Sequence, residues 1–246
     1  MSKTLPKLEK YVKKILSSRV YDVAVETPLQ PAGNLSRRLG CRVTLKREDL
    51  QPVFSFKIRG SYNKIVQLSA DEQARGVIAA SAGNHAQGVA LAARHLGLKA
   101  IIVMGQNTPS IKVDAVRNLG AKVVLHGDAF DQAAARAAEL TRKHGYVYVH
   151  PFDDVDVIAG QGTVGMEIMN QHSGRPDAIF VPVGGGGLIA GISAYVKYLS
   201  PGTRIIGVEA EGSACLAAAM AAGRRVRLPF ESLDLFADGV SVAQVG

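Results

Sequence analysis

Short apolar runs rich in Val and Ile alternate with longer Ala-rich stretches from about residue 40 onward. The apolar runs have the length of buried strands, and the stretches between them place apolar side chains three and four residues apart. Several of these stretches end at a glycine, such as Gly97, Gly120 and Gly145, which is a common signal for the end of a helix. The alternation predicts an α/β protein built on parallel sheets with crossover helices.

The pattern also predicts two domains, because it is interrupted near Gln51-Pro52 and again at residues 150–154, where proline and acidic residues cluster. We expect a small domain of residues 53–150, inserted into a larger domain of residues 1–52 and 151–246. The predicted strands span residues 42–46, 77–80, 100–104, 122–125, 147–149, 178–183 and 204–209. The clearest predicted helices span residues 86–95, 109–119, 131–144, 160–171 and 188–199.

The composition fits a globular protein with a sizeable core, since 47% of the 246 residues are hydrophobic and 20% are charged. No apolar run approaches the roughly 20 residues of a membrane-spanning helix, so no membrane segment is expected. The basic stretch 3–19 resembles either a transit peptide or a capping helix. Glu9 and the lack of a Ser- and Arg-rich composition favour the capping helix.

Charge and cysteine content narrow the classes of function. The formal net charge is +8, but the basic residues are scattered and not interleaved with aromatic residues. This distribution favours attraction of small anionic ligands over nucleic-acid binding. Cys41 and Cys215 lie far apart without metal-ligand spacing, so we expect neither a disulfide framework nor a zinc site. The two cysteines fit a reducing cytoplasm.

The segment Ser55-Phe56-Lys57-Ile58-Arg59-Gly60 opens a helical pattern with two cations, where the helix dipole favours anions. We expect Ser55 to be the N-cap, which places Lys57 in or next to the first turn. Partial desolvation, the positive end of the helix and the nearby Arg59 all favour a neutral amine, which an imine-forming lysine needs. The alternative is a solvated Lys/Arg pair at the start of a surface helix, and this hexapeptide alone does not decide between them.

A turn of small and polar residues, 81–85, links the predicted strand 77–80 to the next helix. Such a turn aims main-chain amides at an anion, at the edge of the sheet where α/β proteins bind ligands. Asn84 adds a side-chain donor and acceptor. The alternative is an ordinary strand-to-helix turn with a capping Ser or Asn.

A run of four glycines, 184–187, precedes Leu188 and opens another predicted helix. Glycines permit positive φ and close approach, so several amides can converge on one phosphate. A rival interpretation is a dinucleotide fingerprint, Gly185-x-Gly187-x-x-Ala190, with Glu209 as the acid that binds ribose. That fingerprint normally stands at the first strand-to-helix turn of its domain, and it leaves Lys57 unexplained.

Together the three segments resemble the fold-type II pyridoxal-phosphate enzymes, and most closely the biosynthetic threonine ammonia-lyases, or threonine dehydratases. The resemblance runs from Thr27-Pro28-Leu29, through Lys46-Arg47-Glu48-Asp49, to Asp238-Gly239-Val240, which is nearly the whole chain. It implies the tryptophan synthase β-like fold, with two doubly wound parallel-sheet domains, the smaller inserted in the larger.

The resemblance also implies roles for individual residues. Lys57 would carry pyridoxal 5'-phosphate covalently, Phe56 would pack beside its ring, and Asn84 would hydrogen-bond its phenolic oxygen. The cofactor phosphate would be bound by the amides of Gly184, Gly185, Gly186, Gly187 and Leu188. The substrate carboxylate would be received by Ser81, Ala82, Gly83, Asn84 and His85.

The implied reaction is deamination of L-threonine to 2-oxobutanoate and ammonia by α,β-elimination of water, the first step of isoleucine biosynthesis, with Lys57 as general base. The alternatives are an L-serine dehydratase, a truncated remnant without catalysis and, less favoured, an NAD-binding oxidoreductase. Ala82 stands where serine racemases carry a serine that acts as acid and base, which argues against racemisation. Cys215 stands where a family metal site would need an acid, so no metal is expected.

The resemblance also sets expectations for the assembly and for the end of the chain. Family members are commonly dimers or tetramers, so a cytoplasmic homo-oligomer acting on a small amino acid is expected, without nucleic acid or membrane as a partner. Their catalytic domains continue past the position of Gly246 and supply a hydroxyl group that faces the pyridine nitrogen. We therefore expect an incomplete large domain, either in a fragment of a longer protein or in a truncated product.

Overall fold

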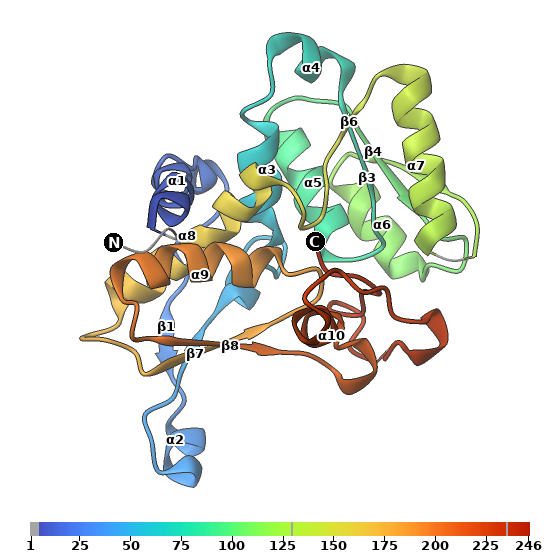
Figure 1. The fold of residues 1–246 in the computed structure, drawn as a ribbon. Helices are drawn as coiled ribbons and strands as arrows, with labels where there is room; N and C mark the ends of the chain where they lie inside the picture. The colour runs from blue at the N-terminus through green and yellow to red at the C-terminus, as the bar shows by residue number, and fades with distance from the viewer. Residues whose placement is uncertain (1–4, 129, 235) are drawn as a thin grey trace.

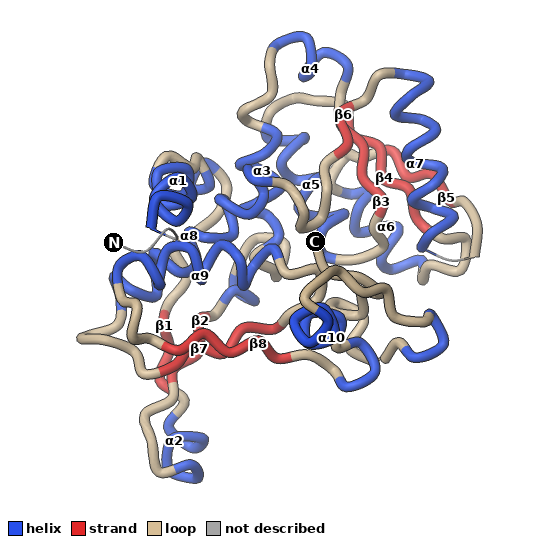
Figure 2. The backbone as a smooth tube through the Cα atoms, in the orientation of Figure 1, coloured by secondary structure: helices blue, strands red, loops and turns tan. Residues whose placement is uncertain are grey.

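The structure, a computed structural model, describes residues 5–128, 130–234 and 236–246. The chain forms two parts, an upper and a lower one in the view of Figure 1, with the C-terminus between them. In the tube view of Figure 2, the strands form two separate groups, one in each part. No helix among the described residues is both long and apolar enough to cross a membrane.

The upper part contains a four-stranded parallel sheet in the order β5-β4-β3-β6. Alternate residues of β3 point to opposite faces: Val77 and Ala79 pack in a core with α5, whereas Ile78 and Ala80 pack with α7. Helices therefore cover both faces of the sheet, which confirms the doubly wound α/β prediction. The elements are β3 (Val77–Ala80), α5 (Asn84–His95), β4 (Ala100–Met104), α6 (Ser110–Asn118), β5 (Lys122–Leu125), α7 (Phe130–His144) and β6 (Val147–Tyr148).

The lower part holds two strand pairs among the described residues. β7 pairs parallel with β8, whereas β1 pairs antiparallel with β2. The predicted strand 42–46 is thus shorter than expected and belongs to an antiparallel pair. The elements are α1 (Leu5–Leu16), β1 (Leu29–Pro31), α2 (Gly33–Leu39), β2 (Thr44–Lys46), α8 (Val155–Gln171), β7 (Ala178–Pro182), α9 (Gly187–Leu199), β8 (Arg204–Val208) and α10 (Cys215–Ala222), with short 3-10 turns Val20–Asp22, Glu48–Leu50, Glu211–Ser213 and Phe230–Ser232.

Helix α8 starts earlier than the hydrophobic pattern predicts. The prediction began at residue 160, but the helix begins at Val155 because the carboxylate of Asp154 accepts the N–H groups of Asp156 and Val157 at 2.8 and 3.2 Å. An Asp at this position is a strong N-cap. The cluster of acidic residues that we read as a break is therefore also a helix start.

Helix α3 (Lys57–Ile65) joins the two parts, and α4 (Ala70–Arg75) follows it. α3 packs against both α5 and α8. Glycine permits the second contact: a Cβ on Gly160 would lie 2.6 Å from the carbonyl oxygen of Arg59, which is closer than side chains pack. The residue that opens α3, Lys57, therefore lies where the two parts meet.

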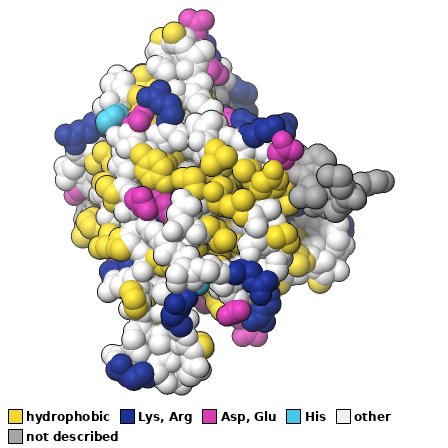
Figure 3. Space-filling view, turned by 90° about the vertical axis from the view of Figure 1, so that its left-hand side faces the viewer, with side chains coloured by type: hydrophobic (Ala, Val, Ile, Leu, Met, Phe, Trp, Pro, Cys, Tyr) yellow, Lys and Arg dark blue, Asp and Glu magenta, His cyan; other side chains and the backbone are white. Residues whose placement is uncertain are grey.

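The side of the molecule on the left of Figure 1 carries a band of hydrophobic side chains across its middle (Figure 3). Charged side chains are scattered above and below this band. A contiguous apolar area with polar surroundings is typical of a surface that contacts protein.

Candidate active site

Lys57 is the first residue of α3, as predicted. Its Nζ donates a hydrogen bond to the carbonyl oxygen of Pro151 at 2.9 Å and lies 5.5 Å from the ring centroid of Phe56. No carboxylate among the described residues forms an ion pair with it. Burial lowers the pKa of the Lys57 amine from 10.5 to about 8. A substantial fraction of the amine is therefore neutral near physiological pH.

The expected cap of α3 is wrong. Phe56, with helical φ and ψ, occupies the N-cap position and makes no side-chain cap hydrogen bond. Ser55 lies one residue earlier, where its Oγ accepts the N–H of Lys57 at 3.3 Å. The hydroxyl of Ser55 thus satisfies one donor at the helix start without being the N-cap.

Arg59 does not act on Lys57 as we expected. Its side chain is fully buried, and its Nε and Nη2 donate to the Glu48 carboxylate at 2.7 and 2.8 Å. Nη2 also donates to Glu167 of α8 at 3.0 Å. Two carboxylates therefore balance the guanidinium charge, and burial alone accounts for the lowered pKa of Lys57. The alternative of a solvated Lys/Arg pair is excluded for Arg59 by this burial.

The network around Arg59 joins three segments of the chain. Glu167 also receives Lys46 of β2 in an ion pair and the hydroxyl of Tyr21 at 2.8 Å. A buried charge is tolerated when it is paired and hydrogen-bonded in this way. Neither partner has a local signal in the sequence, since Glu167 lies 108 residues from Arg59 and Glu48 lies 11 residues away in a different element.

The turn 81–85 follows β3 and opens α5, as expected. Gly83 is the N-cap and makes no side-chain cap hydrogen bond, while Ser81 Oγ accepts the N–H of Gly83 at 3.2 Å. The turn lies near Lys57, because a Cβ on Gly88 of α5 would lie 3.1 Å from the carbonyl carbon of that residue. The turn thus brings the positive end of α5 towards the lysine.

His85 faces the core and not a cleft. Its Nε2 lies 2.8 Å from the carbonyl oxygen of Val149, and its Nδ1 lies 3.4 Å from the hydroxyl oxygen of Ser61. Burial, followed by the charge of Lys57, lowers the pKa of His85 to about 3, so the ring is neutral. Its neutral form fits donation from Nε2 to the carbonyl. Only the main-chain N–H of His85 is left for the predicted contact with a substrate carboxylate.

The glycine loop, residues 184–187, follows β7 and ends at the start of α9. Gly186 has a φ of +90°, which side-chain-bearing residues rarely adopt. A Cβ on Gly187 would lie 2.8 Å from the carbonyl oxygen of Phe152, and one on Gly184 would lie 3.1 Å from the Cα of Val240. The loop therefore presents main-chain amides and the positive end of a 13-residue helix within tightly packed walls.

Two consecutive residues connect the lysine to the glycine loop. Pro151 accepts the hydrogen bond from Lys57, and Phe152 packs against Gly185 and Gly187. From the sequence, this segment is expected only to mark a domain boundary. A local signal for a packed turn is nevertheless present, because the aromatic Phe152 follows Pro151 and precedes the N-cap residue Asp154.

These features fit pyridoxal 5'-phosphate as a ligand. A partly buried amine without an acidic partner suits covalent attachment of an aldehyde, and the glycine cradle at a helix N-terminus suits a phosphate. Within the described segments, Ser241 Oγ is a buried oxygen without a hydrogen-bond partner. Because the preceding residue, Val240, lines the glycine loop, this unpaired oxygen lies next to the wall of the loop that would hold the phosphate.

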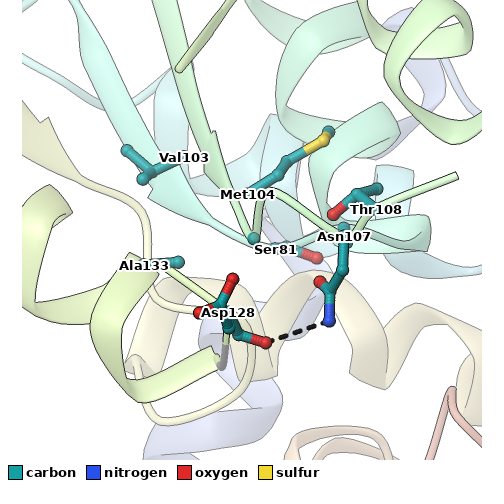
Figure 4. A pocket seen from close by; sticks show the side chains of 9 residues that line it. Ser81, Val103, Met104, Asn107, Thr108, Asp128 and Ala133 are labelled. Atoms are coloured by element: carbon teal, nitrogen blue, oxygen red, sulfur yellow. Dashed lines mark hydrogen bonds between the residues drawn. The ribbon is translucent and has the colours of Figure 1, made fainter. Parts of the chain in front are cut away.

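A separate cavity of about 120 Å³ lies at the carboxyl ends of the small sheet. Figure 4 shows Asn107 Nδ2 donating to the carbonyl oxygen of Asp128 at 3.0 Å beside it. Of the predicted site residues, only Ser81 and Ala82 line this cavity, so it adjoins the candidate site without containing Lys57. The lining residues are Ser81, Ala82, Val103, Met104, Gly105, Asn107, Thr108, Asp128 and Ala133.

The dinucleotide interpretation fails at Glu209. Its two carboxylate oxygens accept the N–H groups of Leu216 and Ala217, each at 2.9 Å, and so cap α10. The acid that would bind a ribose is already used. Cys215, at the start of α10, is buried, and burial raises the pKa of its thiol. The described part of the chain contains no group of three or more His, Cys, Asp or Glu residues that could hold a metal ion.

Comparisons with known proteins show the family to which the chain belongs. The family described as "Pyridoxal-phosphate dependent enzyme" matches residues 20–246. The biosynthetic L-threonine dehydratase of Pasteurella multocida is 58% identical over 96% of this chain and 45% of its own length. The chloroplastic biosynthetic threonine dehydratase of Arabidopsis thaliana is 59% identical over 96% of this chain and 40% of its own. The chain thus spans about half the length of the curated relatives it matches.

Solved structures show the same fold. The processed form of threonine deaminase isoform 2 from Solanum lycopersicum has a TM-score of 0.95 and 54% identity, covering 98% of this chain and 66% of that one. Maize serine racemase has a TM-score of 0.88 and 31% identity, covering 98% and 71%.

Proposed function

Because this chain belongs to the family of pyridoxal-phosphate dependent enzymes, we propose that it is the catalytic part of a threonine ammonia-lyase. It deaminates L-threonine to 2-oxobutanoate and ammonia by α,β-elimination of water, a step that supplies isoleucine biosynthesis. The observation that carries the proposal is the hydrogen bond from the Lys57 amine to Pro151, whose neighbour Phe152 packs against the glycine loop. Burial lowers the pKa of this amine to about 8.

The proposed binding residues combine the roles implied by the family resemblance with the positions of these residues in the fold. The amides of Gly184 to Leu188 and the positive end of α9 hold the phosphate, and Lys57 carries the cofactor covalently. Phe56 packs beside the ring, and Asn84, the first residue of α5, hydrogen-bonds the phenolic oxygen. The amides of the turn 81–85 receive the substrate carboxylate at the positive end of α5.

Proton transfer falls to Lys57. Pyridoxal phosphate, when bound, supplies an electron sink for the negative charge that develops at the substrate α-carbon. Lys57, once released by the incoming amino group, removes the α-proton at its Nζ as general base. Its lowered pKa matches this task, because a lysine at its ordinary pKa of 10.5 is almost entirely protonated near neutral pH. Ala82 carries no group that exchanges a proton, which disfavours racemisation at the same carbon.

The experiment combines a spectrum with a product assay. The purified protein, incubated with pyridoxal phosphate, is expected to show a visible absorbance band that borohydride removes, and to form 2-oxobutanoate from L-threonine. Faster formation of pyruvate from L-serine would reassign the substrate to serine. A normal band without turnover of either amino acid would identify a chain that binds the cofactor without catalysis.

We further propose that the protein is a cytoplasmic homo-oligomer, a dimer or tetramer. The apolar band on the face shown in Figure 3 supports self-association, since areas of this kind mark protein interfaces. Light scattering during size-exclusion chromatography is expected to give a mass of two or four times 26.0 kDa. A mass of one chain at micromolar concentration would refute this proposal.

A further inference from the structure

One short turn contacts both halves of the candidate site. Residues 150–152 lie between β6 and α8. The carbonyl oxygen of Pro151 receives Lys57 Nζ at 2.9 Å, and the carbonyl oxygen of Phe152 lies 2.8 Å from a Cβ built on Gly187. A side chain that fixes the conformation of this turn therefore fixes the lysine amine and the wall of the glycine loop together.

The ring of His150 makes the hydrogen bonds that close the turn. The N–H of Asp153 donates to Nδ1 at 2.8 Å, and the N–H of Phe152 donates to the same atom at 3.3 Å. Because both partners are amide donors, Nδ1 must carry a lone pair, and the proton of the neutral ring lies on Nε2. Tyr148 and Phe152 pack edge-on against the ring, with centroids at 6.1 and 4.7 Å, and so restrict its rotation.

We propose that His150 is a positioning residue, which holds the Pro151 carbonyl against the Lys57 amine by accepting two amide protons at Nδ1. The role of the amine in this inference rests on the proposed function, whereas the hydrogen bonds belong to the chain itself. Without these bonds the turn relaxes, the carbonyl leaves the amine, and water reaches Lys57. The lysine then loses the burial that makes it a base near neutral pH.

Burial keeps the lone pair of His150 available at neutral pH. Burial is the largest effect and lowers the pKa of His150; Asp153 and Asp154 raise it by smaller effects, and the positive charges of Lys57 and Arg225 lower it by still smaller ones. Arg225 is itself paired with Asp153 at 3.1 Å. A pKa below the ordinary value leaves the ring neutral at pH 7, so the turn stays closed until the solution is acidic.

Two substitutions separate the position of the acceptor from the volume of the ring. His150→Asn keeps an acceptor oxygen near the place of Nδ1, where asparagine closes turns onto following amides. His150→Gln is closer to histidine in size but places its amide near the position of Nε2. His144→Ala, on the exposed end of α7, serves as the matched control.

The readout is the reactivity of Lys57 in the cofactor-free protein. An amine-reactive reagent labels the chain at a series of pH values, and mass spectrometry of the Lys57 peptide gives the midpoint of the profile. The midpoint of the profile reports the pKa of the amine, whereas the accessibility of the amine changes only the amplitude of labelling. The wild type, His150→Asn and His144→Ala are expected to share a midpoint near 8.

In His150→Gln the midpoint is expected to rise towards 10.5, so that the neutral fraction of Lys57 at pH 8 falls at least about fivefold. The proposal is overturned if His150→Gln keeps the wild-type midpoint. It is equally overturned if His150→Asn shifts as far as His150→Gln, because ring volume would then matter and the acceptor would not.

A measurement on the unmodified chain covers the case in which His150→Gln does not fold. In protein labelled with ¹⁵N in its histidine side chains, His150 is expected to show an unprotonated Nδ1 and a protonated Nε2 at pH 7. A protonated Nδ1 would contradict the proposal, since that atom could not accept an amide proton. Neither measurement uses the cofactor, so a failure to bind pyridoxal phosphate would refute the proposed function and leave the role of His150 intact.

Discussion

Replacing Lys57 by methionine is expected to stabilise the cofactor-free protein at neutral pH. Methionine keeps most of the apolar length of the lysine side chain but removes a charge from a buried position. The pKa of Lys57 falls from 10.5 in a solvated chain to about 8 in the folded protein. Folding therefore acts against the charged amine, and the substitution removes this cost.

The size of the effect follows from the two pKa values. The difference between 10.5 and about 8 corresponds to a cost of about 3 kcal/mol when both states are protonated. Loss of the hydrogen bond from Nζ to Pro151 offsets about 1 kcal/mol of the gain. The net expectation at pH 7 is a gain of about 2 kcal/mol, which for a chain of this length raises the melting temperature by roughly 4–8 °C.

The pH dependence gives the sharper test. A lysine whose folded pKa is lowered destabilises the fold fully below its folded pKa, and this cost disappears as pH rises to the unfolded value. The advantage of Lys57→Met in urea unfolding should therefore shrink between pH 8 and 10.5. Lys64→Met is the matched control, because Lys64 pairs with Asp154 at 2.8 Å and its loss should destabilise. A Lys57→Met protein less stable than wild type at pH 7, or an advantage that does not change with pH, would refute this reasoning.

Three further substitutions test the packing that positions the site. Arg59→Met removes the buried cation that Glu48 and Glu167 share, although Glu167 keeps Lys46. It should cost about 3–5 kcal/mol in urea unfolding, and a loss below about 1 kcal/mol would show that the network is not held as described. Gly160→Ala forces a Cβ to within 2.6 Å of the Arg59 carbonyl oxygen and should cost about 1–3 kcal/mol by thermal unfolding. The control Gly83→Ala meets open space and should change stability by less than about 0.5 kcal/mol. Equal losses would contradict the close approach of α3 and α8. Gly187→Ala pushes against the carbonyl of Phe152 and should weaken the binding of pyridoxal phosphate at least about tenfold in a fluorescence titration, so an unchanged dissociation constant would place the phosphate elsewhere.

The strands of the small sheet and the start of α3 could be predicted from the sequence because their signals are local. Val77 to Ala80 is a continuous apolar run of strand length, buried on both faces as parallel strands are. The glycine loop before α9 could likewise be predicted, since four consecutive glycines weaken a fold and are expected only where side chains are excluded. Each of these features depends on neighbouring residues alone.

The parts that could not be predicted depend on contacts across the chain. Glu48 and Glu167 contact Arg59 only in the folded chain and balance its charge, so the expected lowering of the Lys57 pKa by Arg59 was wrong. The expected cap of α3 was wrong because the helix begins one residue later than a cap at Ser55 implies, with Phe56 at the N-cap position. The preceding chain bends at Phe54, whose φ of +55° is unusual for a large side chain. The link from His150 to Lys57 likewise spans 93 positions, the difference between the two residue numbers, and leaves no periodic signal.

The central claim is that Lys57 carries the cofactor, and one measurement tests it most directly. The protein is incubated with pyridoxal phosphate, reduced with borohydride and digested, and the modified peptide is located by mass spectrometry. The account predicts a single phosphopyridoxyl group on Lys57, whose amine is less protonated than an ordinary lysine because of its lowered pKa. Modification spread over the exposed lysines, or confined to a different one, would contradict it.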